Sequence, residues 1–437
     1  MKAVKFGGTS MSTAEAVLEV KRIIESDPSR RFVVVSAPGK AAGENKVTDM
    51  LIEVAASKAD VRVELFAAVR ARFAKILDGI GLGGNALDAE FEKIESELPS
   101  APYDYTVSRG EYLTAIMLAK LLDYEFADAA EFVKFERGAY DDVHTEKLCA
   151  AALGKCRRAV VPGFYGSDEN GNIVTFSRGG SDVTGAIVAR AAGASVYENY
   201  TDVDGFMTCD PRIVPHASVI DILTYRELRE LAYMGANVLH PESIFPVRKA
   251  NIPIHVLNTF NGSAHGTMIV PTEDLLGGKY RRNKKMPITA IAGRQHFFSL
   301  YIEKSMMNSE VGFMRKVLSS FERLGVSVEH VPSGIDSMTV VFSAVDGETC
   351  NALIDDIKKE VDPDHISLTT DMSLIAIVGH GMRSRPGTAA RAIMRLSNAE
   401  INLRMIDQGA SEINIILGVS DDDFARALIA LNGEFEV

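Results

Sequence analysis

Hydrophobic positions in the N-terminal part of the chain alternate between short continuous runs and longer helical stripes. The runs Ala3–Phe6, Arg31–Val35 and Ala159–Val161 have the length of strands, and such runs are typical of strands buried on both faces of a parallel sheet. Between the first two runs, apolar residues recur at helical spacing from Val17 to Ile24. The order strand, helix, strand predicts an α/β fold with a mainly parallel sheet. Further strands are expected at 173–176, 196–200 and 252–257, and further helices at 48–55, 61–77, 108–122, 183–192 and 225–234.

A pair of glycines follows the first predicted strand, in the stretch Lys5–Ser10. Glycines let a backbone approach a ligand closely, and the N–H groups at the start of a helix form an anion site. Ser12 and Glu15 fit a capping box that would begin this helix. We therefore interpret Gly7 and Gly8 as a phosphate-binding turn, with Lys5 as a cation beside the phosphates. The alternative is an ordinary βα turn without a ligand.

A second pair of glycines, Gly179 and Gly180, precedes the helix predicted at 183–192. Before the pair stands Arg178, whose planar guanidinium suits a carboxylate. After it stand Ser181 and Asp182, which either bind a ligand or simply cap the helix. The sequence thus predicts two glycine turns at helix starts, one with a lysine and one with an arginine.

Three further stretches allow a purely structural interpretation. Glu111 is expected in the first turn of the helix at 108–122, where the helix dipole alone would favour a carboxylate. Thr201–Gly205 follows a predicted strand, and Asp and Thr are common turn formers. Gly79–Gly84 matches a dinucleotide-binding pattern, but that pattern needs a strand before it and a helix after it. Because a helix precedes it here, we interpret this segment as the loop that ends that helix.

The C-terminal part contains an internal repeat at an offset of 75 residues, which follows a basic segment at 279–285. Gly312–Val341 aligns without a gap on Gly387–Ile416, and each copy has a glycine, a helix and two strands. The first of these strands is expected at 326–329 in one copy and at 401–404 in the other. A strand, helix, strand, strand unit is half of a ferredoxin-like module, so we predict two tandem modules.

Composition and charge mainly exclude certain classes of binding partner. The chain of 437 residues has a net charge of -12 and a pI near 5.4, so it offers no basic surface for nucleic acid or an anionic membrane. No apolar stretch reaches the ~18 residues of a membrane span, and no secretory signal precedes the first strand. The four cysteines lack Cys-x-x-Cys spacing, as is typical of reduced thiols. We expect a cytoplasmic protein without a dedicated metal site.

Together these stretches resemble the amino-acid kinase family, and within it the aspartate kinases. The motifs that carry the resemblance span nearly the whole chain and are Lys5–Ser10, Phe176–Asp182, Thr201–Gly205, Asp210–Arg212, Val238–Pro241 and Met405–Asn414. The resemblance implies an αβα sandwich at 1–278 and a linker at 279–287. It further implies two ferredoxin-like βαββαβ ACT domains at 288–370 and 371–437, one interleaved with the other.

The resemblance also implies roles for individual residues. Lys5, Asp182 and Arg178 would be catalytic: Lys5 would stabilise the transferring phosphoryl group, Asp182 would orient Lys5 or meet the substrate ammonium, and Arg178 would hold the α-carboxylate of aspartate. The implied aspartate-binding residues are Ser36, Thr48, Glu111, Arg178, Gly179, Gly180 and Ser181. The implied ATP-binding residues are Lys5, Gly7, Gly8, Thr201, Asp202, Met207, Asp210, Arg212 and Asn237. The family often has Lys at the position of Asn237 and Tyr at that of Met207, and Arg212 is a candidate replacement cation.

The implied reaction is ATP-dependent phosphorylation of the side-chain carboxylate of L-aspartate to 4-phospho-L-aspartate, the first step towards lysine, threonine and methionine. A carboxylate with a pKa near ~3.9 is already ionised at neutral pH, so no general base is required. Mg²⁺ would bind through the ATP phosphates. The alternatives are a kinase for another amino acid, such as glutamate, and a non-catalytic amino-acid sensor.

The ACT modules imply feedback inhibition by an end-product amino acid, with lysine favoured, bound between modules of two chains. The protein would then be a homodimer or a higher homo-oligomer. The implied effector-binding residues are Met307, Gly312, Phe313, Val328, Glu329 and Ser333. Glu329 would suit a cationic amino acid. The alternative is a region that serves dimerisation alone.

Overall fold

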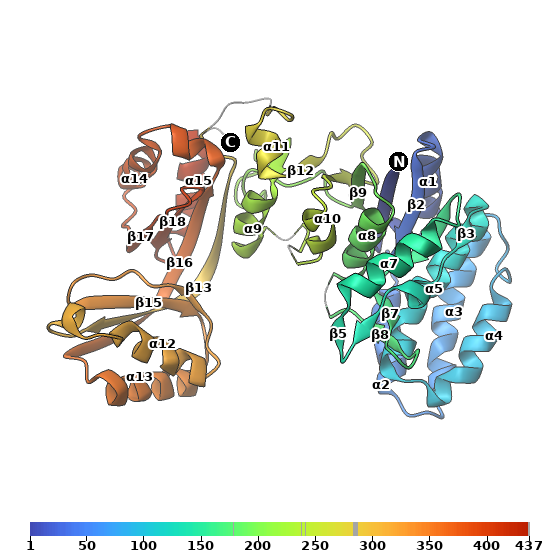
Figure 1. The fold of residues 1–437 in the computed structure, drawn as a ribbon, viewed down its shortest axis with the longest axis horizontal. Helices are drawn as coiled ribbons and strands as arrows, with labels where there is room; N and C mark the ends of the chain where they lie inside the picture. Colours follow the sequence, from blue (N-terminus) through green and yellow to red (C-terminus); the bar gives the residue numbers. More distant parts are fainter. Residues whose placement is uncertain (178, 237, 241, 283–286, 436–437) are drawn as a thin grey trace. The chain divides into compact units, whose positions relative to one another are not determined.

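The computed structural model describes residues 1–177, 179–236, 238–240, 242–282 and 287–435. The chain forms two compact units (Figure 1). The first comprises Met1–Phe206, Val219–Ala232 and Asn237–Asn283, and the second comprises Met207–Ser218, Tyr233–Ala236 and Lys284–Val437. The predicted C-terminal modules are therefore joined in the second unit by two short stretches from the middle of the sequence.

The first unit is built on an eight-stranded sheet with the order β10-β12-β11-β9-β1-β2-β6-β3. All its neighbouring strands run parallel except β11 and β12, which confirms the mainly parallel sheet. Its strands are β1 (Lys2–Phe6), β2 (Arg30–Val35), β3 (Glu125–Phe126), β6 (Ala159–Pro162), β9 (Val196–Thr201), β10 (Ile222–Thr224), β11 (Ile254–Asn258) and β12 (Thr267–Val270). Two small antiparallel pairs are β4 (Phe135–Glu136) with β5 (Ala139–Tyr140), and β7 (Tyr165–Ser167) with β8 (Ile173–Thr175).

Helices cover both faces of this sheet. Successive side chains of a strand point to opposite faces, and Lys5 and Asn199 both reach Asp182 at the start of α8 (Gly180–Ala191). Glu198 points the other way, where Arg30 joins it to Ser26 at the end of α1 (Ala14–Ser26). The sheet therefore lies between helix layers, as expected for an αβα sandwich.

The other helices of this unit pack around these two layers, and α3 and α4 lie side by side in Figure 1. They are α2 (Val47–Ala56), α3 (Arg62–Gly79), α4 (Asp88–Glu97), α5 (Tyr103–Leu122), α6 (Ala129–Phe132), α7 (Asp142–Leu153), α9 (Tyr225–Tyr233, its last residue in the second unit), α10 (Phe245–Lys249) and α11 (Thr272–Leu276), with 3-10 turns η1 (Thr9–Met11) and η2 (Leu98–Ser100). Among the described residues, no helix combines the length and apolar composition needed to span a membrane.

The second unit contains a six-stranded antiparallel sheet with the order β14-β15-β13-β16-β18-β17. Its elements are β13 (Ala290–Glu303), η3 (Met307–Ser309), α12 (Phe313–Arg323), β14 (Val328–His330), β15 (Ser337–Ser343), α13 (Gly347–Val361), β16 (His365–Val378), η4 (His380–Ser384), α14 (Thr388–Asn398), β17 (Met405–Asp407), β18 (Asn414–Val419) and α15 (Phe424–Phe435). The long strands β13 and β16 pair along their lengths and serve both modules, so the proposed module boundary at 370 lies inside β16.

The internal repeat has the same structure in both copies. Gly312 precedes α12 with a φ of 85°, and Gly387 precedes α14 with a φ of 90°, a region that favours glycine. Each helix is followed by a short strand and a longer one. The second short strand, β17, begins directly after the predicted segment 401–404, which itself is not a strand.

Two short stretches complete the core of the second unit. Cys209 and Val214 belong to the hydrophobic cluster formed by α14, α15 and the strands β16 and β18. The Thr208 carbonyl accepts a hydrogen bond of 2.8 Å from the Ile291 N–H at the start of β13. In the other stretch, the Tyr233 carbonyl accepts one from Arg294. The stretch 207–218 therefore packs as a part of the second unit.

Candidate active site

Lys5 and Asp182 form an ion pair at the carboxyl end of β1. The Lys5 ammonium lies 2.7 Å from Asp182 Oδ1, and both side chains are largely buried. The amide of Asn199, on the neighbouring strand β9, donates a hydrogen bond of 2.8 Å to the same oxygen. The resemblance left two roles open for Asp182, which were to orient Lys5 or to meet the substrate ammonium. This geometry favours the role of orienting Lys5.

The Gly7–Gly8 turn lies directly beside this pair. A Cβ atom at Gly7 would lie 3.6 Å from the Lys5 ammonium. The Gly7 N–H donates to the Tyr200 carbonyl, so it is already satisfied. Within the described residues, the N–H groups of Gly8 and Thr9 have no hydrogen-bond partner. The turn therefore presents two free N–H donors near one ammonium, which is the donor set of a phosphate site.

The helix that follows this turn begins one residue later than predicted. Thr13, not Ser12, caps α1, because its hydroxyl accepts a hydrogen bond from the Ala16 N–H. The Ser12 hydroxyl instead donates to the Thr9 carbonyl, since residues 9–11 form the 3-10 turn η1. The predicted capping box of Ser12 with Glu15 is thus wrong by one position.

Thr201 and Asp202 lie next to the same turn, at the end of β9. Asp202 accepts a hydrogen bond of 3.0 Å from the Thr9 hydroxyl and another of 3.2 Å from the Thr201 hydroxyl. Because β1 and β9 are parallel neighbours, their carboxyl ends meet at one edge of the sheet. The structure therefore brings together Lys5, the glycine turn, Thr201 and Asp202.

Glu111 is buried in the middle of α5, eight residues from its start, and not in the first turn as predicted. The helix dipole therefore does not explain this carboxylate. Its Oε2 has no hydrogen-bond partner among the described residues. Burial raises the pKa of Glu111 to about 8, although a hydrogen bond from the Ala37 backbone opposes this shift. An unpartnered buried carboxyl group is the kind of group that a bound ligand completes.

Close packing places α5 against the loop that carries Ser36. A Cβ atom at Gly110 would lie 2.7 Å from the Ala37 Cβ and 3.1 Å from a Val47 methyl group. Ser36 and Ala37 follow β2, and Thr48 is the second residue of α2. The structure therefore groups Ser36, Thr48 and Glu111 at the end of β2, the strand next to β1.

The second glycine turn packs tightly at the start of α8. Gly179 has a φ of 56°, in the left-handed region that favours glycine. A Cβ atom at Gly163 would lie 2.6 Å from the Ser181 side chain, which is itself buried. Ser181 and Asp182 belong to the first turn of α8, so the helix begins earlier than the predicted residue 183. Arg178 and Asn237 lie outside the described residues.

Three of the predicted ATP-binding residues belong to the second unit, whereas Lys5 belongs to the first. They are Met207, Asp210 and Arg212. Arg212 is exposed and pairs with Asp210 at 2.7 Å, which lowers the pKa of that carboxyl group.

The predicted effector residues all lie in the second unit, in η3, at the start of α12, in β14 and just after β14. The side chains of Met307 and Phe313 are buried in the core of this module, and Val328 packs against them. Glu329 accepts hydrogen bonds from the Ser343 hydroxyl, at 3.0 Å, and from the Tyr233 hydroxyl. Among the six predicted effector residues, Glu329 is the one with a charged side chain. Ser333 forms an isolated bridge with Met338, and Gly312 begins the helix.

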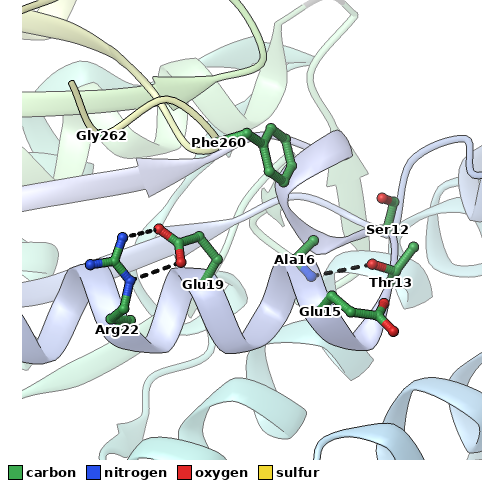
Figure 2. Close-up of a pocket in the computed structure, with 8 residues that line it drawn as sticks. All are labelled: Ser12, Thr13, Glu15, Ala16, Glu19, Arg22, Phe260 and Gly262. Atoms are coloured by element: carbon green, nitrogen blue, oxygen red, sulfur yellow. Dashed lines mark hydrogen bonds and ion pairs between the residues drawn. The ribbon is translucent and has the colours of Figure 1, made fainter. Parts of the chain in front are cut away.

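A surface cavity of about 430 Å³ lies beside the N-terminal half of α1 (Figure 2). Glu15 and Glu19 both line it, and its one guanidinium, Arg22, already pairs with Glu19. Phe260 covers one side of it. Two carboxylates and one neutralised cation disfavour phosphate groups, so this cavity does not compete with the Lys5 side of the turn as an anion site.

Asn199 is a site residue that the sequence analysis missed. It lies in β9, and its side chain is buried at the edge where Lys5 and Asp182 meet. The signal that could have identified it is an amide in the middle of an otherwise buried strand, because buried polar groups are retained only with partners.

Comparison with known proteins identifies the family. A model of the amino acid kinase family matches residues 1–258, and a model of the ACT domain matches residues 375–435. The chain is 37% identical to aspartokinase 3 of Bacillus subtilis, over 100% of this chain and 98% of that protein. The solved aspartate kinase of Clostridium acetobutylicum has 41% identity and a TM-score of 0.91, with 100% of both chains covered. Aspartokinase III of E. coli in complex with aspartate and ADP has 25% identity and a TM-score of 0.76, again with 100% of both chains covered. The chain therefore belongs to the amino acid kinase family and, within it, to the aspartokinases, the ATP-dependent kinases of aspartate.

Proposed function

We propose that this chain transfers the γ-phosphoryl group of ATP to the side-chain carboxylate of L-aspartate at the carboxyl edge of β1, β2 and β9. The observation that carries this assignment is the Lys5 ammonium, held by Asp182, beside the free N–H groups of Gly8 and Thr9. One charge and two amides can stabilise the negative charge that spreads over a transferring phosphoryl group.

The attacking group needs no general base. The aspartate side chain has an ordinary pKa near ~3.9 and arrives ionised at neutral pH. The task of the site is therefore to bring two anions together, and Lys5 is the group placed to offset their repulsion. Asp182 and Asn199 fix the Lys5 side chain, so that its position need not be established anew in each turnover.

Aspartate would occupy the region between the ends of β1 and β2. In this assignment Arg178 binds the α-carboxylate, and Glu111, Ser36 and Thr48 bind the amino and carboxyl groups. Gly179, Gly180 and Ser181 shape the wall beside them. The unpartnered oxygen of Glu111 supports this placement, because an ammonium group would satisfy it.

ATP would lie along the same edge, with its phosphates at Gly7 and Gly8 and with Thr201 and Asp202 beside them. Met207, Asp210, Arg212 and Asn237 complete the proposed nucleotide set. Mg²⁺ would neutralise part of the phosphate charge. The ion would be bound mainly by the ATP phosphates and water.

The ACT region would bind a regulatory amino acid, with lysine as the first candidate. Aspartokinase III of E. coli has been solved with lysine and aspartate in a T-state. In this chain Glu329 supplies a carboxylate for a cationic side chain, at the positions around Met307, Gly312, Phe313, Val328 and Ser333. A homodimer through the ACT modules is part of this proposal.

The reaction is tested by a coupled ADP-release assay with aspartate, glutamate and acetylglutamate as acceptors. We expect turnover with aspartate, and activity with the other two lower by at least about 10²-fold in kcat/KM, since each places its carboxylate differently from the fixed Lys5. A preference for glutamate would assign the chain to another amino acid, and no ADP release with any acceptor would contradict the proposed chemistry.

A further inference from the structure

Arg72 is a buried cation for which the proposed chemistry gives no role. It lies in α3, its side chain is 5% exposed, and its neighbours on the same helix face are Val69, Phe73 and Ile76. Burying a guanidinium is costly unless acceptors surround it. The acceptors that Arg72 finds belong to the loops of the candidate active site.

One guanidinium contacts both loops. It donates a hydrogen bond of 2.6 Å to the Ser12 carbonyl, at the end of the segment that begins with Gly7 and Gly8. It donates a longer one, of 3.4 Å, to the Gly39 carbonyl, and it forms an ion pair with Glu44. Gly39 and Glu44 belong to the loop between β2 and α2, which starts at Ser36.

The two loops also touch each other directly. The Gly39 N–H donates a hydrogen bond of 2.7 Å to the Gly8 carbonyl. A Cβ atom at Gly39 would lie 2.6 Å from the Gly8 carbonyl carbon, and one at Gly8 would lie 3.0 Å from the Ala37 carbonyl oxygen. A shift of either loop therefore moves the other, and with it the free N–H of Gly8.

We propose that Arg72 is a positioning residue for phosphoryl transfer, because its guanidinium joins the glycine turn to the loop of Ser36. This inference rests on the proposed function, in which the turn binds ATP and the loop binds aspartate. Arg72 would then fix the distance between donor and acceptor while touching neither. Only a forked cation reaches two carbonyls and a carboxylate together, so lysine is a poor replacement.

The test compares Arg72→Lys and Arg72→Met with the wild-type chain, using kcat together with separate calorimetric dissociation constants for ADP and aspartate. We expect kcat to fall by about 10²-fold in Arg72→Met and by at least about 10-fold in Arg72→Lys, since small misplacements of reacting groups are that costly. Each ligand still meets its own loop, so both dissociation constants should stay within about threefold of wild type.

Lys75→Met is the matched control. Lys75 lies one turn further along α3, pairs with the same Glu44 at 2.6 Å and has a largely exposed side chain. Within the described part of the chain it donates no hydrogen bond to the backbone of either loop, so its loss should leave kcat within about twofold of wild type. A matching fall of kcat in this control would mean that Glu44, and not the guanidinium, fixes the loops, and would overturn the proposal.

A purely structural role for Arg72 predicts a different result. The melting temperature would fall, but kcat per folded site, counted by ADP stoichiometry, would stay within about twofold of wild type in both variants. That outcome overturns the inference, and if Arg72→Met does not fold, Arg72→Lys decides alone. The proposed function is tested separately. A Lys5→Met variant with normal kcat would contradict the proposed active site. An inactive Lys5→Met variant, together with Arg72 variants of normal kcat, would contradict only the role of Arg72.

Discussion

Lys5 and Lys2 lie on one strand and have different surroundings, which makes them a matched pair. Lys5 faces α8 and Asp182, whereas Lys2 lies at the other end of β1 and pairs with Glu198 at 2.7 Å and Asp27 at 3.1 Å. We predict that Lys5→Met lowers kcat by about 10²- to 10³-fold, the usual cost of losing one group that stabilises transition-state charge. Aspartate binding, measured by calorimetry, should survive.

Lys2→Met is the control for the loss of a charged lysine from β1. It should change the melting temperature but not kcat, because its partners Glu198 and Asp27 lie away from the glycine turn. If Lys5→Met loses aspartate affinity and keeps its kcat, then Lys5 belongs to the acceptor site and not to the phosphoryl group.

Glu111 makes stability depend on pH. Burial raises its pKa from 4.5 to about 8, so between these values the folded chain holds a proton that the unfolded chain has released. The free energy of unfolding therefore falls as pH rises through this range, by up to about 1.4 kcal/mol per unit of pKa shift. We predict that Glu111→Gln removes this contribution, so that denaturant titrations at pH 5 and pH 8 differ less than in wild type.

The same carboxyl group links aspartate binding to protons. If Glu111 pairs with the substrate ammonium, it must ionise, and binding near pH 7 should release a proton. Calorimetry in buffers of different ionisation enthalpy measures that release, which Glu111→Gln should abolish. An unchanged proton count in the variant would show that Glu111 does not meet the ammonium.

Helices and strands with a clear pattern of apolar residues were predictable from the sequence, but the residues at which they begin and end were not. The runs at Ala3–Phe6 and Arg31–Val35 became β1 and β2 because burial on both faces leaves an uninterrupted apolar pattern. The start of α5 was missed by five residues, since Tyr103–Val107 carries no cap signal. Polar residues dominate α4, which was not predicted. The helix α7 was not predicted either, because its apolar stripe is weak: its buried residues are Thr145, Cys149 and Leu153. The strand β8 was expected, but it pairs with β7 outside the main sheet. Tertiary packing determines which strands pair, and the sequence of one strand does not show it.

The candidate site was predictable to the extent that glycines and charges mark it in the sequence. Lys5, Gly7, Gly8 and Asp182 stand next to turns, where polar residues are conspicuous. Arg72 and Asn199 stand inside a helix and a strand, and their partners lie far away in the sequence, so only the folded chain shows what they bind. A charged residue within the apolar stripe of α3 was the available signal.

The packing of α8 on β9 gives a prediction at the level of the element. A Cβ atom at Gly185 would lie 2.2 Å from the Tyr197 hydroxyl and 2.7 Å from its ring. Alanine normally favours a helix over glycine, but here overpacking should dominate and destabilise the fold by about 1–3 kcal/mol. In Gly185→Ala with Tyr197→Phe, the nearest clash is gone, so chemical denaturation should show part of the loss recovered. Additive losses in the double variant would contradict this account.

At the scale of the whole molecule, Glu329 tests the regulatory proposal. We predict that Glu329→Gln raises the lysine concentration for half-inhibition by at least about 10-fold, because a charge-assisted contact with a cationic effector is lost. Uninhibited kcat should stay close to wild type. Glu322→Gln, an exposed glutamate on α12, is the control and should leave inhibition unchanged. Equal sensitivity of wild type and Glu329→Gln would place the effector elsewhere.

The stretch 207–218 gives a prediction about truncation. Cys209 is buried in the cluster of the second unit, and burial raises the pKa of its thiol to about 11. In a chain that ends at residue 278, this cluster is missing, so we expect Cys209 to react quickly with a thiol reagent and the melting temperature to fall. Cys149, buried in the first unit, should stay unreactive in both chains. A truncated chain with a protected Cys209 would show that this stretch folds without the ACT modules.

The second unit is assembled from three separate stretches of the chain. The unit that carries the proposed regulation therefore cannot be exchanged as one continuous segment of the gene. A chimera made by one crossover before the ACT region would combine a foreign core with the native 207–218, whose Cys209 and Val214 pack in the native core. Transplanting the effector response of one aspartokinase into another should require moving 207–218 and 233–236 together with the C-terminal region, and natural recombination within this family faces the same constraint.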